Sequence, residues 1–212
     1  MKRHGALVLF LVAFAATSGH VEAQAPPTKY DQLVDRLKVG DRTVDFTEAR
    51  LAFTETPAYN GRMMVFYRQL WGALNMRDFE GALAIADKAL QLSYVEPNAH
   101  MVAALAHREL GHPDLERLHR FIADGLLQSI ASRGDGKTQE TAYQVIDISE
   151  EYALFRSMNL TPKGQAAGPA GADGRIVDRT TVVDRRTSEE RVMFFSVDNP
   201  DAVKKRHEVQ PR

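Results

Sequence analysis

The chain has 212 residues, with 27 basic and 28 acidic side chains, a formal net charge of −1 and no cysteine. This near-neutral balance gives no reason to expect nucleic acid or an anionic membrane as a partner. Disulfides are excluded, so stability must come from a packed core. A chain of this length can build one such core, and we expect one domain with at most an appendage.

The N-terminus has the pattern of a secretory signal peptide. A basic start precedes an apolar run over residues 5–16, and small residues follow as far as Ala25. The run is shorter than the ~20 residues that span a bilayer. We expect residues 1–25 to be removed, with Ala23 as the alternative cleavage site. The mature protein is then periplasmic or extracellular and has no transmembrane segment. A retained anchor is the alternative interpretation.

Residues 28–160 predict a mainly helical domain that ends in a strand and a short helix. Apolar side chains recur at helical spacing, and capping residues and prolines mark the helix ends. The predicted helices cover residues 30–38, 45–55, 62–76, 78–93, 97–110 and 113–130. Their similar lengths and short links indicate antiparallel helical hairpins.

One of these helices resembles the second helix of a tetratricopeptide repeat. Phe79 supplies the aromatic side chain of that motif, and Ala82, Ala86 and Ala89 supply the small residues for close helix contact. The resemblance implies a repeat-like bundle. A full array needs about three repeats to bury its faces, and the neighbouring helices match less well, so a long solenoid is not expected.

The chain changes character after the last of these helices. A turn at residues 134–136 leads into a β-branched and aromatic strand over 142–148, and a short helix follows. Residues 161–175 are rich in Gly, Ala and Pro and predict a flexible loop. Residues 176–212 predict a β-hairpin, packed on the same domain, and a basic tail. We expect the three strands to form a small C-terminal antiparallel sheet, which gives an α+β, mostly α fold.

Two sequence blocks resemble the signature of a known family. The first runs from Asp45 to Thr54 and continues in Pro57–Tyr59; the second runs from Gly134 to Tyr143 and continues to Tyr152. Both are similar to motifs of a bacterial family called domain of unknown function 4919. The resemblance implies an exported or envelope protein, and it implies no reaction.

Candidate functional residues fall in these two blocks. Both blocks are polar and aromatic, so they could line one cleft, but we favour the alternative that they are capped turns which lock the helices to the sheet. The candidates are Thr54, Tyr59, Asp135, Lys137, Thr138, Glu140 and Tyr143. The Gly-Lys-Thr triplet at 136–138 ends like a phosphate-binding loop, but position 131 is Ala and the strand and helix come in the reverse order. We therefore predict no nucleotide and no cofactor.

Histidines at 100, 107, 112 and 119 raise the alternative of a metal site. Imidazole is a common metal ligand, and His100 and His107 share a helix face. His119 could approach them if the next helix folds back. No two histidines have the i, i+4 spacing of a helical zinc site, so we expect core or solvated histidines and no metal.

Three functions remain open. The leading one is a non-enzymatic binding or scaffold module of the cell envelope that contacts envelope proteins or peptides. The second is a hydrolase of an envelope polymer that uses two acidic side chains as acid and base, chosen from Asp135, Glu140, Asp147, Glu150 and Glu151. The third is a binder of a small ligand or a metal. Acids at the start of a helix also have a purely structural role, so we favour binding over catalysis.

Overall fold

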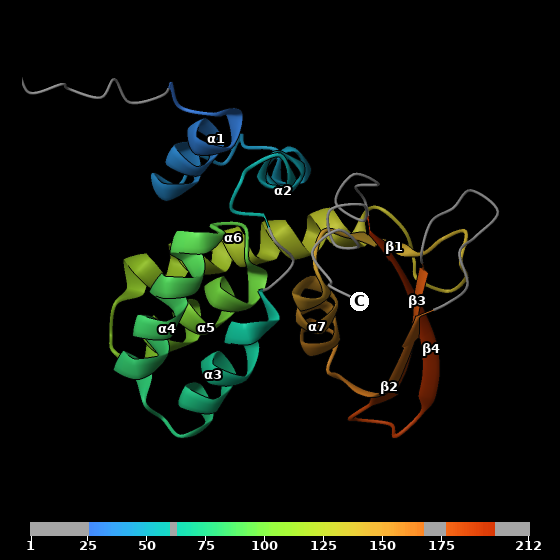
Figure 1. Ribbon diagram of the computed structural model, residues 1–212. Coiled ribbons are helices and arrows are strands. Elements are labelled where there is room, and N and C mark those ends of the chain that lie inside the picture. Colours follow the sequence, from blue (N-terminus) through green and yellow to red (C-terminus); the bar gives the residue numbers. More distant parts are fainter. Residues whose placement is uncertain (1–25, 60–62, 168–176, 198–212) are drawn as a thin grey trace, which may run out of the picture.

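The computed structural model describes residues 26–59, 63–167 and 177–197 (Figure 1). The described helices are α1 (Lys29–Lys38), α2 (Phe46–Thr54), α3 (Met64–Asn75), α4 (Phe79–Leu92), α5 (Pro97–Glu109), α6 (Pro113–Ala131) and α7 (Ile148–Ser157). The described strands are β1 (Tyr143–Val145), β2 (Leu160–Ala167), β3 (Val177–Asp184) and β4 (Glu190–Val197). The predicted α+β, mostly α class is confirmed. The predicted signal peptide and basic tail lie outside the described residues.

The helices begin where the sequence supplies capping side chains. Thr28 and Asp31 form a capping box at the start of α1, and Asp45 accepts the free backbone N–H groups at the start of α2. Asp78 and Asp147 do the same for α4 and α7. These local signals explain why the predicted helix positions are confirmed.

Helices α3 and α4 pack as one hairpin, and α5 and α6 pack as a second (Figure 1). Ala82, Ala86 and Ala89 are fully buried between the neighbouring helices, as the small residues predict. Helix α7 lies between these hairpins and the sheet, and it contacts α3, α5 and the strands β1 and β2. The molecule therefore has α7 as its central element.

Helices α1 and α2 form a separate pair that covers α6 and the link between α4 and α5. The rings of Tyr30, Phe53 and Tyr59 pack against one another beneath this pair. Phe46 lies directly against Gly125 of α6, where any Cβ would clash with its ring. Gly125 thus allows α2 to approach α6 closely. Within the described ranges, no helix is long and apolar enough to cross a membrane.

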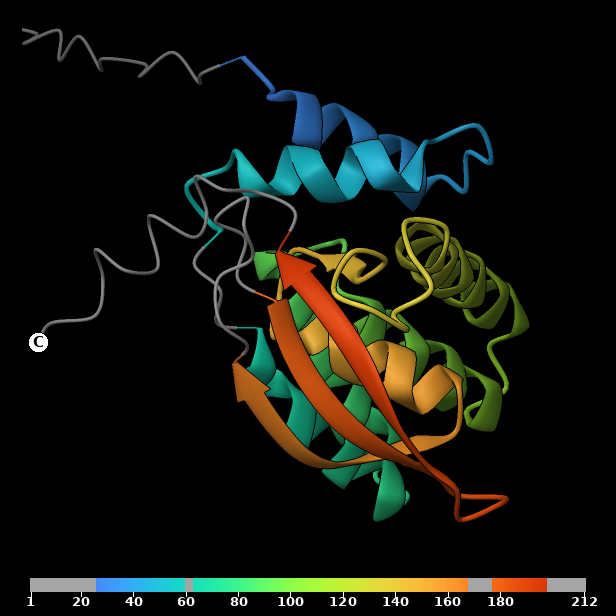
Figure 2. The ribbon, with the colours of Figure 1, turned by 90° about the vertical axis from the view of Figure 1, so that its right-hand side faces the viewer.

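The sheet is mixed, and this corrects the prediction of a purely antiparallel sheet. Its strand order is β1-β4-β3-β2, and Figure 2 shows the sheet in the foreground with the helices behind it. Strands β2, β3 and β4 are antiparallel neighbours, but β1 pairs in parallel with β4. The reason lies in the connection between β1 and β2, which is a crossover through α7 and leaves these two strands pointing the same way. Strand β4 has the direction of β2, because both are antiparallel to β3, so β1 is parallel to β4.

Strand β2 was not predicted, because its residues lie in the segment expected to be a flexible loop. Of the predicted loop, residues 161–167 belong to this strand, and residues 168–176 lie outside the described part. Pro162 and Gly164 have low strand propensity, and the pairing with β3 is irregular between them. An edge strand tolerates both residues, since one side of its backbone has no partner in the sheet.

Candidate functional site

The two signature blocks meet in the protein core through a salt bridge. The Arg50 side chain on α2 donates from Nε to Glu150 Oε1 at 2.7 Å and from Nη2 to Glu150 Oε2 at 2.7 Å. Arg50 also donates to Ser129 Oγ at 3.2 Å and to the Gln144 carbonyl at 3.0 Å. Both ions are 1% exposed. A buried pair survives only when its remaining hydrogen-bonding groups are satisfied, which these partners provide.

A second hydrogen bond joins the same two blocks, from Tyr59 after the end of α2 to Ile146 before the start of α7. The Tyr59 hydroxyl donates to the Ile146 carbonyl at 2.5 Å, and the Ile146 N–H donates to Glu150 Oε2 at 2.9 Å. Thr54 is buried at the end of α2, and its hydroxyl donates to the Leu51 carbonyl. Thr54 and Tyr59 therefore belong to the core. We call Arg50, Tyr59, Ser129, Ile146 and Glu150 the buried network.

A neighbouring polar cluster fixes the start of α5 to the start of α7. Glu96 accepts from the N–H and the side-chain amide of Asn98 and from Ser149 Oγ, the last at 2.7 Å. The Asn98 amide also donates to the Ser149 carbonyl at 2.8 Å. Burial raises the pKa of Glu96 to about 7, against the lowering effect of its hydrogen bonds. At neutral pH Glu96 thus holds a proton part of the time.

Helix α7 covers the faces of α3 and α5 that a repeat-like bundle would offer to a partner. The Arg156 guanidinium lies 3.6 Å from the centre of the Trp71 ring, a cation–π contact between α7 and α3. Tyr152 packs edge-on against Tyr67 at 5.0 Å. This face is therefore occupied by the protein's own helix.

The loop over residues 134–141, here named the signature loop, is held by Asp135. Asp135 Oδ1 accepts from Thr141 Oγ1 at 2.6 Å and from the Lys137 N–H at 3.1 Å, and Oδ2 pairs with Lys137 Nζ at 3.1 Å. The Thr141 hydroxyl, followed by the two Lys137 groups, lowers the pKa of Asp135 to about 2. Gly136 has φ +63°, and a Cβ there would strike the Tyr143 ring. These contacts have the form of a structural turn.

The other candidates of this loop are exposed. Thr138 exchanges hydrogen bonds with Thr141 across the turn. Glu140 has a lowered pKa because it accepts from its own backbone N–H and from Thr138. The Gly136 carbonyl accepts from the Phe194 N–H at 2.9 Å, so the loop is fastened to β4.

An open groove lies between the signature loop and β4. It has a volume of about 510 Å³, and its lining includes Lys137, Tyr143, Met158, Arg191 and Met193. Lys137 and Arg191 are exposed, whereas Tyr143 and Met193 are buried and form the floor. We call it the signature groove. Asp135 lines the groove as well and pairs with Lys137, so the rim offers Arg191 and an ion-paired Lys137 above an apolar base.

The carboxylates suggested for hydrolysis have other partners in the structure. Both oxygens of Glu150 bind Arg50, and Asp147 accepts the Ser149 N–H at the start of α7. Glu151 is buried as well. Among these acids only Asp135 and Glu140 are exposed, and both are engaged in the turn.

The four histidines come together, as the back-folding of α6 predicts. His100 Nδ1 lies 2.9 Å from His119 Nδ1, and His107 Nδ1 lies 3.2 Å from His112 Nδ1. In the part of the chain that the structure describes, no three His, Cys, Asp or Glu side chains are arranged to hold a metal. The histidines instead hydrogen-bond to one another.

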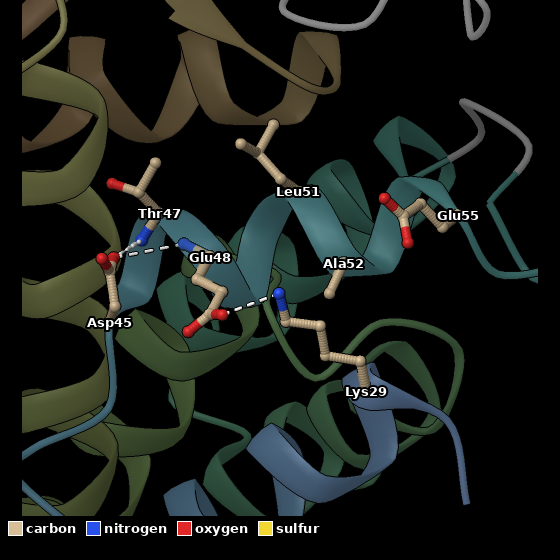
Figure 3. A pocket seen from close by; sticks show the side chains of 7 residues that line it. All are labelled: Lys29, Asp45, Thr47, Glu48, Leu51, Ala52 and Glu55. Carbon is tan, nitrogen blue, oxygen red and sulfur yellow. Dashed lines mark hydrogen bonds and ion pairs between the residues drawn. The ribbon is translucent and has the colours of Figure 1, made fainter.

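A further pocket of about 490 Å³ lies beside α2 (Figure 3). Lys29 reaches across it from α1 and pairs with Glu48 at 2.7 Å, while Asp45 caps the helix. Its charged side chains therefore join α1 to α2, and the pocket itself offers little for a ligand.

Several residues of the buried network and of the neighbouring polar cluster were not named as candidates from the sequence. Arg50 lies inside a recognised block, but Ser129, Glu96 and Asn98 do not. The available signal for Arg50 was a basic side chain flanked by Ala49, Leu51 and Ala52 on a helix that turns an apolar face to the core. Such a charge needs a buried partner, although the sequence does not say which.

The fold and site define a mostly helical α+β protein in which residues of the two signature blocks form a buried network and the signature loop borders an open groove. Over residues 16–200 the chain matches the family model described as Domain of unknown function (DUF4919). The match spans most of the chain, and the protein belongs to this family. Neither the search of curated proteins nor the search of solved structures finds a match.

Proposed function

We propose that this protein is an exported, non-enzymatic binding module of the bacterial cell envelope, and that the signature groove receives an acidic segment of an envelope protein or peptide. The N-terminal signal pattern supports export. The observation that carries the binding proposal is the groove itself. It places two exposed cations, Arg191 and the Asp135-paired Lys137, over an apolar floor beside the signature loop.

The contacts of the acidic side chains favour binding over hydrolysis. A hydrolase needs an acid and a base that both face an open site. Glu150 is 1% exposed and is held by Arg50, and Asp135 is held by Thr141 and Lys137. The groove rim is instead suited to carboxylates, which guanidinium and ammonium groups bind through charge-assisted hydrogen bonds.

Helical repeats commonly bind peptides in a concave face between their helices. Here α7 covers α3 and α5, with Arg156 on Trp71 and Tyr152 on Tyr67. This packing supports a ligand surface on the sheet side of the molecule in preference to one between the helical hairpins.

The test uses the mature protein and an extract of envelope proteins. Bound proteins are identified by cross-linking, and an acidic peptide from the contact is titrated against the wild type and Lys137→Ala/Arg191→Ala. We expect at least a tenfold loss of affinity, about 1.4 kcal/mol, with an unchanged melting temperature. The matched control is Lys88→Ala/Arg117→Ala, which removes two exposed cations elsewhere. Equal affinity of both double variants, or release of soluble fragments from an envelope polymer, would contradict the proposal.

A further inference from the structure

Helices α5 and α6 bring four histidines into one continuous row. His100 and His119 meet through their Nδ1 atoms at 2.9 Å, His107 and His112 meet likewise at 3.2 Å, and the rings of His107 and His119 stack at 5.4 Å. We call these four residues the histidine row. Its inner end is fully buried at His100, and its outer end is exposed at His112.

Hydrogen bonding determines which nitrogen of His100 carries the proton. Nε2 lies 2.8 Å from the Tyr94 carbonyl, which can only accept, so Nε2 carries the hydrogen. A neutral imidazole has a single N–H, so Nδ1 of His100 is bare and accepts from Nδ1–H of His119. A further proton on His100 would have to bind Nδ1, where it would face that N–H. The hydrogen bond between His100 and His119 therefore requires a neutral His100.

Burial also favours the neutral form of the row. It lowers the pKa of His100 to about 3, and the neighbouring His119 adds to the effect. Burial and the neighbouring His107 lower the pKa of His119 to about 4. Burial lowers the pKa of His107 as well, next to His112 and against the opposing charge of Asp87.

Tyr94 connects the inner end of the row to α1. Its carbonyl accepts from His100, its ring packs edge-on against the His100 ring at 5.0 Å, and its N–H donates to the Tyr30 hydroxyl at 2.7 Å. Tyr30 lies on α1. His119 lines a pocket of about 610 Å³ between α1, α4 and α6, together with the same two tyrosines.

Few charges near the row could compensate a positive imidazole. The pocket that His119 lines also contains Asp31 and Lys38 of α1 and Asp87 of α4, which are two carboxylates and one cation. On α6, Glu116 pairs with Arg120, and on α5, Arg108 pairs with Glu109. The carboxylates therefore lie at the rim of this pocket, whereas the His100 side of the His100–His119 contact is fully buried.

We propose that the histidine row is an acid-sensitive latch that keeps α1 docked while its imidazoles are neutral. Acid breaks the contact between His100 and His119, loosens the Tyr94 link, and releases α1 from α4 and α6. The sign follows from linkage. The docked state binds fewer protons than an open state with ordinary histidines, so docking is strongest above pH ~6.5 and weakens as the pH falls toward 4.

The expected size of the pH effect on α1 docking can be worked out from the titration of His119 alone. With a pKa of about 4 when docked and ~6.5 when open, the open fraction at pH 5 rises roughly 30-fold over its value above pH 7. Titration of His100 in the open state adds to this rise. The sheet, which lies on the far side of α7, should not respond.

The test is amide hydrogen exchange on the full mature chain, corrected for intrinsic rates, at pH 7.5 and pH 5. The Tyr94 N–H and the α1 amides should lose roughly 30-fold protection at pH 5, whereas the Phe194 N–H of β4 should not. His119→Asn keeps an N–H donor for His100 but cannot titrate, and it should remove most of the loss. His112→Asn, at the exposed end, should keep it.

Three results would overturn the latch. They are equal protection at both pH values, an undiminished loss in His119→Asn, and a rise in protection on adding zinc chloride at pH 7.5 that His119→Asn abolishes. The last would make the row a metal site. If His119→Asn does not fold, the NMR titration of His119 in the wild type decides: a pKa below ~5 supports the latch, and a pKa near ~6.5 refutes it.

Discussion

Removing one partner of the Arg50–Glu150 pair should destabilise the protein more than any exposed change. In Arg50→Met, the buried Glu150 carboxylate loses two bonds of 2.7 Å from the guanidinium and keeps the bond from the Ile146 N–H. The Gln144 carbonyl loses its bond from Arg50 as well. Breaking a buried pair in this way costs about 3–5 kcal/mol, because a charge stays buried without its counterion.

The double variant Arg50→Met/Glu150→Leu separates the charge effect from lost packing. Both charges are gone, so the remaining cost comes from the hydrogen bonds that the Ile146 N–H and the Gln144 carbonyl lose, about 1–3 kcal/mol each. The double variant should therefore lose about 2 kcal/mol less than the sum of Arg50→Met and Glu150→Leu.

Urea unfolding of the two single variants and the double variant measures this coupling, provided that the m-value stays constant. Arg117→Met is the matched control, since Arg117 pairs with Asp114 on the surface and its loss should change stability little. A loss below about 1 kcal/mol in Arg50→Met, or additive single losses, would refute the account of the buried network.

Three further predictions concern other parts of the fold. Gly136→Val should destabilise the protein by more than ~1 kcal/mol, because position 136 has a positive φ and the new side chain would clash with Tyr143. Asp135→Asn should barely lower the melting temperature, since the amide oxygen still accepts from Thr141. A larger loss of stability in Asp135→Asn than in Gly136→Val would contradict a structural turn. Ala86→Leu should cost ~1–3 kcal/mol in chemical unfolding, and an unchanged value would argue against close packing at this fully buried site. Burial raises the pKa of Glu96 to about 7, so the stability that the protonated side chain contributes is full below pH ~4.5 and is lost as the pH rises through 7. Glu96→Gln should therefore be more stable than the wild type at pH 8, by up to ~3 kcal/mol, but not at pH 5. A difference in stability between the two proteins that does not change with pH would contradict this.

The helices were predictable because their signals are local. Thr28, Asp45 and Asp78 cap the helices that follow them, and apolar spacing does the rest. The sheet was predictable only in part. The direction of β1 depends on the crossover through α7, and β2 is stabilised by pairing with β3 and not by its own Pro- and Gly-containing sequence.

The candidate site shows the same limit. Tyr59 was named from its motif, but its partner is a backbone carbonyl 87 residues away. Arg50 and Glu150 are separated by 100 residues, so no local pattern joins them. Thr54 could have lined a cleft or held a turn, and it lies in the core. The histidines were noticed because they are close in sequence, and α6 folds back on α5 to join them.

The central claim is that the family signature builds the fold, while the cations at the rim of the signature groove bind the ligand. The most direct test is the affinity of Arg191→Glu for the acidic envelope peptide, measured by titration calorimetry beside the melting temperature. The account predicts at least a tenfold weaker affinity at an unchanged melting temperature, because the charge at the rim is reversed. An unchanged affinity would contradict it.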